Sequence, residues 1–218
     1  MKSWCDSAIS QTSSFQTYSN SNPFVTGLLI EAVTGQRYEA VLKERVLDLR
    51  ATYLPGSDDP TVATPVLLGY ASDTGEDVTE AASFGGWAWA SGGLVSTTED
   101  MGKFVRGYLG GALLSGRGRA AQRAHLIPGN SEPQGPGTNS VGLGLFSYQT
   151  PCGTVYGHTG SILGYTLFMA ASEDGTRSVT LAISTQYTAP LLPQLRAAET
   201  RAVCIALGVG ARPIAAGL

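Results

Sequence analysis

Four apolar segments near the C-terminal end of the chain are separated by links that leave room only for tight turns. The segments cover residues 143–148, 154–158, 164–171 and 177–185. The links contain Pro151-Cys152-Gly153 and Glu173-Asp174-Gly175, which are typical turn sequences. Links this short join antiparallel strands, because a parallel crossover needs a dozen or more residues. This part of the sequence therefore predicts an antiparallel sheet.

Helical periodicity occupies the residues on both sides of this predicted sheet. Helices are expected, in chain order, at residues 22–35, 38–47, 96–109, 119–125 and 193–207. Their ends carry recognisable signals: Asn22-Pro23 suits a helix start, Gly35 suits a helix end, and Ser96-Thr97-Thr98-Glu99 is a capping box. Helices followed by an antiparallel sheet, which a last helix covers, are typical of an α+β fold.

These signals divide the chain into two regions of a single domain. Residues 18–140 are expected to form a mainly helical and loop-rich region, and residues 141–210 to form the sheet with the C-terminal helix. Within the first region, residues 55–86 are rich in Pro, Gly, Asp, Ser and Thr. That stretch predicts a long surface loop, with one short strand near residues 66–70.

Composition limits the classes of partner that the chain can have. The formal net charge is −3, so the sequence predicts no basic face for nucleic acid or anionic lipid. The apolar run at residues 202–211 is far shorter than the roughly 20 residues that a membrane span needs. The two histidines are isolated and no Cys-x-x-Cys pair is present, so no metal site and no cofactor are expected.

Two short polar motifs, far apart in the sequence, have the chemistry of an active site. Tyr18-Ser19-Asn20 precedes the first predicted helix; a tyrosine hydroxyl beside a cation can transfer protons, and an asparagine amide can orient a carbonyl. His158-Thr159-Gly160-Ser161 ends a predicted strand. There Gly160 lets a substrate backbone approach, the Ser161 amide can donate to an oxyanion, and the hydroxyls of Thr159 and Ser161 can reach a substrate oxygen. Each motif alone also occurs by chance.

The residues around both motifs resemble one family. The similar segments are Tyr18–Asn22 with Gly27–Gly35, Ser91–Met101, Gly142–Leu145, and Gly157–Gly160 with Gly164-Tyr165. They resemble the penicillin-recognising serine hydrolases, which include the β-lactamases, and the likeness runs over residues 18–207. It is closest to the secreted serine DD-carboxypeptidases and class C-like esterases, where His-Thr-Gly replaces Lys-Thr-Gly. The resemblance implies a truncated fold of this type, acyl-enzyme hydrolysis of peptide, ester or β-lactam bonds, and a monomer acting on a small molecule or peptide.

The resemblance also implies roles for individual residues. Tyr18 would transfer protons, Asn20 would bind the substrate carbonyl and hold a catalytic lysine, and His158 would shape the strand edge and tune the tyrosine. Residues 159–161 would bind the substrate, with the Ser161 amide in the oxyanion hole. These assignments place the catalytic and substrate-binding candidates on the two motifs, and Trp87 or Trp89 would form a wall of the cleft if it is not simply part of the core.

Two of the three cysteines fall where the secreted DD-carboxypeptidases carry a disulfide. They are Cys152 and Cys204, which leaves Cys5 as the free thiol. Because disulfides form in oxidising compartments, the full-length protein is expected in the cell envelope or outside the cell. Residues 1–6 show no secretory signal of their own.

One motif of the family is missing from this chain. The family's nucleophile lies in Ser-x-x-Lys, whereas Ala40 and Asp100 stand three positions before Lys43 and Lys103, and Lys2 has no residue at that position. A serine without an adjacent base is not an activated nucleophile, so we expect little or no turnover from this chain alone. Loss of the helix and strands that accompany this motif should expose a sheet edge and apolar surface.

A second departure concerns the substrate. DD-carboxypeptidases of this type carry an Arg shortly before the His-Thr-Gly strand, which grips a terminal carboxylate, whereas residues 145–148 read Leu-Phe-Ser-Tyr. Ester, amide and other acyl-transfer substrates therefore stay open. So do two alternatives: a non-catalytic remnant that binds peptidoglycan-like ligands, and an unrelated Ser-His-Asp hydrolase built on His125 or His158. The last lacks a Gly-x-Ser-x-Gly elbow.

Overall fold

The fold is built around one antiparallel sheet. The computed structural model describes residues 19–46, 49–56, 62, 64–71, 79–81 and 88–209. Six strands follow one another in both sequence and space: β3 (Ile127–Pro128), β4 (Thr138–Val141), β5 (Phe146–Thr150), β6 (Gly153–Ile162), β7 (Tyr165–Ala171) and β8 (Ser178–Ile183). Every neighbouring pair is antiparallel. The predicted antiparallel sheet is confirmed, and β3 and β4 are additions to it.

Tight turns set the register of the long strands. Pro151-Cys152 joins β5 to β6, and Leu163-Gly164 joins β6 to β7 with Gly164 at φ 83°. Between β7 and β8 the Asp174 carboxylate accepts hydrogen bonds from the side chain of Ser172 and from the amide and hydroxyl of Thr176. Because one turn residue more or fewer would move every side chain to the other face, these local contacts fix which residues enter the core.

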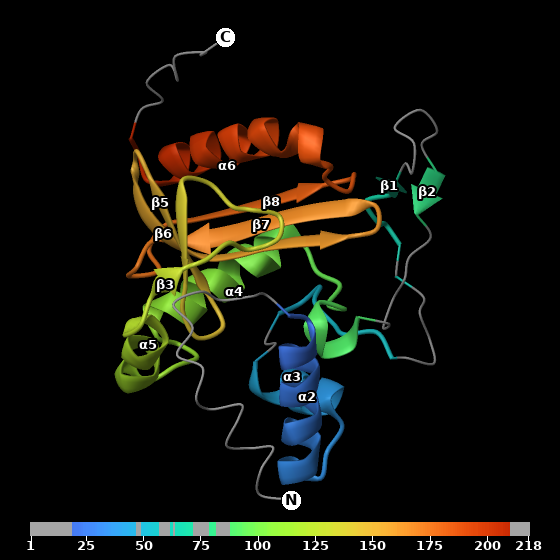
Figure 1. The fold of residues 1–218 in the computed structure, drawn as a ribbon. Coiled ribbons are helices and arrows are strands. Elements are labelled where there is room, and N and C mark those ends of the chain that lie inside the picture. Colours follow the sequence, from blue (N-terminus) through green and yellow to red (C-terminus); the bar gives the residue numbers. More distant parts are fainter. Residues whose placement is uncertain are drawn as a thin grey trace, which may run out of the picture.

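A helix covers each face of the sheet (Figure 1). On one face, α6 (Leu192–Ala206) contributes the fully buried Val203 to a core with Tyr148, Val155 and Phe168. On the other face, α4 (Thr98–Gly110) packs Val105 and Leu109 against Leu145 and Ala171. This arrangement of helices on both sides of an antiparallel sheet is the expected α+β fold, and the C-terminal helix lies across the sheet as predicted.

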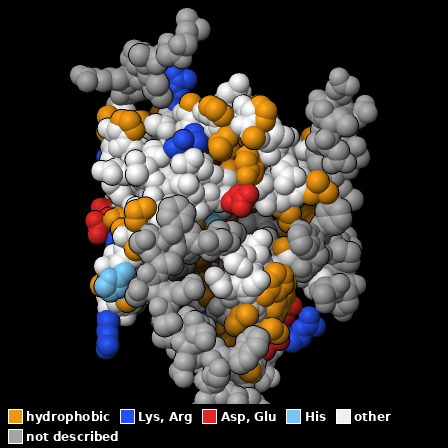
Figure 2. Space-filling model, in the orientation of Figure 1, with side chains coloured by type: hydrophobic (Ala, Val, Ile, Leu, Met, Phe, Trp, Pro, Cys, Tyr) orange, Lys and Arg blue, Asp and Glu red, His pale blue; other side chains and the backbone are white. Residues whose placement is uncertain are grey.

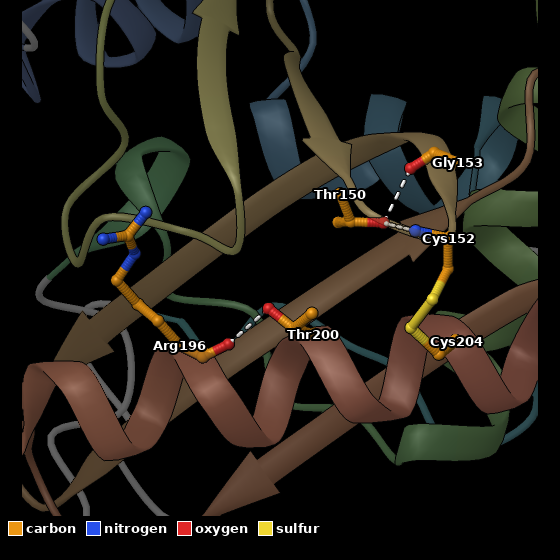
Figure 3. The surroundings of a disulfide bond; sticks show 6 residues. All are labelled: Thr150, Cys152, Gly153, Arg196, Thr200 and Cys204. Carbon is orange, nitrogen blue, oxygen red and sulfur yellow. Dashed lines mark hydrogen bonds between the residues drawn. A yellow bond between two sulfur atoms is a disulfide. The ribbon is translucent and has the colours of Figure 1, made fainter. Parts of the chain in front are cut away.

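A disulfide fastens α6 to the sheet. It joins Cys152, in the turn between β5 and β6, to Cys204 near the end of α6, with 5.2 Å between their Cα atoms (Figure 3). The Thr150 hydroxyl donates to the Gly153 carbonyl and accepts from the Cys152 amide, at 2.7 and 3.2 Å, so the turn is itself held in place. The pairing that the family resemblance implied is present, and Cys5 lies outside the described residues.

The remaining helices lie below the sheet in Figure 1. They are α2 (Ser21–Thr34), α3 (Tyr38–Arg45), the short 3-10 helix η1 (Trp89–Ser91) and α5 (Gly116–Arg123). Two further strands, β1 (Gly69–Ala71) and β2 (Thr79–Ala81), form a separate two-stranded sheet, and the short 3-10 helix η2 (Ala189–Leu191) directly precedes α6. Trp89 holds this part together: its ring contacts those of Phe24 and Tyr38, and its Nε1 donates to Glu39 at 3.1 Å. The predicted helices are all present, with ends shifted by a few residues.

Two helix ends differ from the sequence expectation in an instructive way. Asn20, not Asn22, is the N-cap of α2, and its side chain makes no capping bond. At α4 the cap is Thr97, whose hydroxyl accepts from the Asp100 amide at 3.1 Å. The Asp100 carboxylate does not close a capping box; it accepts from the amide of Ala51 and the hydroxyl of Thr52. The Asp100 carboxylate thus binds a segment that is remote in sequence, and not the start of its own helix.

The expected exposure of apolar surface and of a sheet edge is also found. Four apolar side chains of α2 are between 58 and 77% exposed: Val25, Leu28, Leu29 and Val33. Two of them, Leu29 and Val33, line an open groove of about 470 Å³ between α2 and α3, and Figure 2 shows hydrophobic side chains gathered in this region. Among the described strands β8 pairs only with β7, apart from one bridge between Tyr70 and Thr185 beyond its end. Within the described part of the chain, both surfaces lack a covering element.

Candidate functional site

The second half of β6 is a strand edge left open by a shorter neighbour. We call residues 158–162 the β6 edge. Strand β5 reaches only to Phe146, opposite Gly157, so the β6 edge pairs with β7 alone among the described strands. Hydrogen-bonding directions alternate along an antiparallel strand, and the two-residue turn between β5 and β6 sets their phase. The amides of Thr159 and Ser161 therefore face the open side, which is the geometry that an oxyanion donor needs.

His158 is half-buried at the start of the β6 edge. Its ring meets that of Phe146 edge to face, with centroids 5.0 Å apart, and its Nδ1 lies against the carbonyl oxygen of Thr159. Burial lowers the pKa of the imidazole below its ordinary value, and the contact with the Thr159 carbonyl opposes this more weakly. The ring is therefore neutral near pH 7. With Nδ1 as the donor, Nε2 is the acceptor nitrogen of this tautomer.

The two hydroxyls predicted to contact substrate have different surroundings. The Thr159 side chain is 5% exposed and donates to the carbonyl of Pro133 at 2.7 Å. Its hydroxyl proton is therefore already engaged in a hydrogen bond within the protein. The Ser161 hydroxyl is half-buried and accepts from the Gln186 amide at a long 3.4 Å. Ser161 is thus the more accessible of the two, and the substrate contact of Thr159 stays a prediction.

A buried polar cluster supports the β6 edge from the α6 side. The Tyr148 hydroxyl donates to Ser131 at 3.1 Å and also lies next to Thr159, and burial raises the pKa of this phenol. The Asn139 side chain ties together the loop at residues 135–137 through one accepted and three donated hydrogen bonds. This loop and Pro133 fix Thr159, so the position of the β6 edge depends on buried hydrogen bonds and not on strand pairing alone.

The glycines of β6 give a matched pair of substitutions. A Cβ at Gly160 would lie 3.5 Å from the Leu167 side chain, an ordinary contact, whereas a Cβ at Gly157 would lie 1.9 Å from the Met169 carbonyl oxygen. We expect Gly160→Ala to change the free energy of unfolding by less than about 1 kcal/mol, and Gly157→Ala to cost roughly 2–3 kcal/mol, because the backbone of β7 must move. Urea denaturation of both variants measures the difference. Equal costs would contradict this account of the β6 edge.

The other predicted motif is only partly described. Asn20 is exposed at the N-terminal end of α2, and this end of the helix is the one nearer the sheet in Figure 1. The Ser19 hydroxyl accepts from the Ser21 amide at 3.3 Å, which fixes the first turn. Tyr18 lies outside the described residues. Its approach to His158 therefore stays a prediction, as do the roles of both residues.

Three further residues near the β6 edge carry no sequence signal. Gln186 contacts Ser161, Tyr187 follows it, and the Tyr187 hydroxyl donates to the Glu132 carboxylate at 3.4 Å. They come from two loops that only the fold brings beside β6. Among the described residues no group of three or more His, Cys, Asp and Glu side chains is arranged to hold a metal ion. No helix in the described part of the chain is long and apolar enough to cross a bilayer.

Comparison with known proteins places this chain and its fold in a family. Residues 11–203 match the model of the family described as Beta-lactamase. Among solved structures, a D-stereospecific amidohydrolase from Streptomyces sp. is 26% identical with a TM-score of 0.71, and the match covers 83% of this chain and 54% of that one. The D-amino acid amidase from Ochrobactrum anthropi SV3, solved with L-phenylalanine amide, is 23% identical with a TM-score of 0.68, covering 78% and 50%.

A third match has a different assembly. The octameric penicillin-binding protein homologue from Pyrococcus abyssi is 21% identical with a TM-score of 0.67, covering 88% of this chain and 42% of that one. Because that relative is an octamer, the comparison gives no support to the predicted monomer. The chain spans about half the length of the structures that it matches. The family match covers most of the chain, and the sheet with its helices matches solved structures of this fold: this protein belongs to the β-lactamase family of serine hydrolases.

Proposed function

We propose that this chain forms the strand-edge side of an active site that cleaves amide or ester bonds through an acyl-enzyme. The observation that carries the proposal is the β6 edge, where Ser161 presents a backbone amide on an open strand and Gly160 has no side chain to block a ligand. The Ser161 amide would stabilise the oxyanion of the tetrahedral intermediate. The 26% identity to a D-stereospecific amidohydrolase supports this class of reaction.

The other residues of the site would position the substrate and move protons. Asn20 would orient the scissile carbonyl, and the Tyr18 hydroxyl would carry the proton between nucleophile and leaving group. His158, neutral at pH 7, would add no positive charge beside the tyrosine. The acylated serine itself belongs to Ser-x-x-Lys, which these 218 residues do not contain. We therefore infer that this chain alone binds substrate without turning it over.

An amide or ester substrate is favoured over a peptide with a free terminal carboxylate. The stretch Leu145–Tyr148, where DD-carboxypeptidases of this type carry an Arg, is buried and contains no cation. This stretch therefore offers no guanidinium to a substrate carboxylate. This supports an amidase or esterase specificity and makes a carboxypeptidase specificity the weaker candidate.

Covalent labelling tests the proposed chemistry. We expect neither a fluorescent penicillin nor a fluorophosphonate to label this chain, because it contains no activated serine. A longer form of the protein that carries an in-frame Ser-x-x-Lys should be labelled, and replacing the serine of that motif by Ala should abolish the label. Labelling of the 218-residue chain would show a nucleophile elsewhere and overturn the assignment. A longer form that resists both probes would leave the non-catalytic, ligand-binding alternative.

We also propose a location outside the reducing cytosol. The Cys152–Cys204 disulfide supports it, because such bonds persist in the cell envelope and in secreted proteins. Mass spectrometry of protein recovered from the envelope or the medium should find these two thiols joined. Two free thiols in such material would contradict both the location and the pairing.

A further inference from the structure

Two loops from opposite ends of the sheet region meet beside the β6 edge. Residues 131–134 approach it through the Pro133 carbonyl, which accepts from the Thr159 hydroxyl at 2.7 Å. Residues 184–188 approach it through Gln186, whose amide donates to the Ser161 hydroxyl at 3.4 Å. The two contacts are on side chains two residues apart on the same strand. In each loop, the residue adjacent to the contacting one therefore lies close to the β6 edge.

These adjacent residues are Glu132, which precedes Pro133, and Tyr187, which follows Gln186, and they contact each other. The Tyr187 hydroxyl donates to the Glu132 carboxylate at 3.4 Å. The Tyr187 backbone is anchored in turn, because its amide donates at 2.8 Å to the hydroxyl of Thr166, a buried residue of β7 that pairs with Ser161. The backbone of Glu132 is thus held beside the β6 edge through its neighbour Pro133, and its carboxylate is contacted by Tyr187.

The local charge balance makes this carboxylate important. Residues 131–139, 153–172 and 178–191 contain no Lys, no Arg and no acidic residue other than Glu132. No ion pair involves Glu132 in the described part of the chain, and its side chain is exposed. Burial raises the pKa of the Tyr187 phenol most, and the Glu132 charge raises it further, because a nearby negative charge disfavours the phenolate. These segments therefore offer a ligand at the β6 edge one negative charge and no lysine or arginine of their own, while Arg196 of α6 reaches the first segment, where it donates to the carbonyls of Gly135 and Gly137.

We propose that Glu132 selects ligands that carry a protonated amine near the scissile bond and disfavours ligands that carry a carboxylate there. This inference rests on the proposed function, because it names the substrate class of that site: an amide or ester of a compound with a free, positively charged amino group. A charged hydrogen bond between ammonium and carboxylate is stronger than a neutral one, even at a partly exposed position. Tyr187 acts as a positioning residue that orients the carboxylate.

Binding of two ligands that differ only in charge tests the proposal. Phenylalanine amide carries an ammonium group at about pH 6, below the pKa of an α-amino group, whereas N-acetyl-phenylalanine amide is neutral. Both enantiomers of each are titrated calorimetrically at low ionic strength into the wild-type chain, Glu132→Gln and Glu44→Gln. Glu44 lies exposed on α3, away from both loops, so its variant matches the loss of charge. All variants are checked for native circular dichroism.

We expect Glu132→Gln to weaken binding of phenylalanine amide about fivefold, to leave N-acetyl-phenylalanine amide unchanged, and Glu44→Gln to change neither. Glu132→Arg should reverse the preference in favour of N-acetyl-phenylalanine, whose carboxylate is free. Equal effects on both amides, or none on either, would overturn the role of Glu132 while the binding site itself stands. If neither amide binds to the wild-type chain, the proposed function fails and this inference fails with it.

Discussion

Removing the disulfide is expected to lower the free energy of unfolding by about 4 kcal/mol. The bond joins residues 52 positions apart, and closing a loop of that length in the unfolded chain removes conformational entropy worth about this much. In the folded protein it fastens the end of α6 to the turn between β5 and β6 (Figure 3). Val203, which precedes Cys204 in the chain, is fully buried in the core. An open chain would thus lose the constraint that holds the last helix on the sheet.

The measurement is urea denaturation of the Cys152→Ser, Cys204→Ser double variant, with and without reductant. Both proteins carry Cys5→Ser, so that the third thiol cannot exchange with the bridge. The protein that keeps Cys152 and Cys204 should lose stability when reductant is added, down to the level of the double variant. The stability of the double variant should not change with reductant. If reductant does not shift the denaturation midpoint of the protein that keeps both cysteines, the disulfide contributes nothing to stability.

Replacing Glu199 by Gln is expected to remove a large part of the pH dependence of stability. Glu199 lies on α6 with 0% of its surface exposed, between the buried Leu195 and Val203 one turn to either side. Neither carboxylate oxygen has a hydrogen-bond partner among the described residues. The guanidinium of Arg196 is committed to the carbonyls of Gly135 and Gly137. Burial raises the pKa of Glu199 to about 8, and the Arg196 charge opposes this.

The sign follows from the protons bound in each state. Between about pH 4.5 and pH 8 the folded protein keeps the Glu199 proton, whereas the unfolded chain has released it. Stability from this group is therefore complete below about pH 4.5 and decreases as pH rises, by up to about 1.4 kcal/mol per pH unit. The total loss by pH 8 is on the order of 4 kcal/mol as an upper bound. The neutral amide of Glu199→Gln keeps the shape and has no proton to lose.

Denaturation of wild type, Glu199→Gln and Glu44→Gln from about pH 5 to pH 9 measures this effect. The difference between wild type and Glu199→Gln should change steadily across the range, with the variant the more stable at pH 8, while the exposed control stays parallel to wild type. Since other groups also titrate, only these differences are compared. Parallel curves for wild type and Glu199→Gln would show that Glu199 is ionised in the folded protein.

The strands and turns of the sheet were predictable because their signals are local. Pro151-Cys152-Gly153 and Glu173-Asp174-Gly175 set hairpins through residues that are neighbours in sequence, and both hairpins are present. Strand β4 (Thr138–Val141) was missed, because four mostly polar residues carry no periodic signal. It forms because β5 offers it a ladder, from Thr138 opposite Gln149 to Val141 opposite Phe146, and that ladder depends on the sheet already being there.

The candidate site shows the same division. The motif His158-Thr159-Gly160-Ser161 could be read from the sequence, because its glycine and its place at a strand end are local properties. That the Thr159 hydroxyl points to Pro133 depends on a contact across 26 positions. The junction of Glu132 with Tyr187 spans 55 positions. Ordinary loop residues of this kind have no pattern that marks them before the loops meet.

The sequence by itself determined the α+β class, the hairpins, the helix positions and, through its motifs, the family. Each of these follows from the order of residues within a short window: turn residues, helical periodicity and runs of adjacent motif positions. Only the tertiary structure decided that β5 stops short of the β6 edge, that the Glu199 carboxylate is buried without a hydrogen-bond partner among the described residues, and that the loops of Glu132 and Tyr187 meet beside Ser161. The reason is physical: burial and electrostatic fields sum over all neighbours in space, and most of those neighbours are remote in the chain.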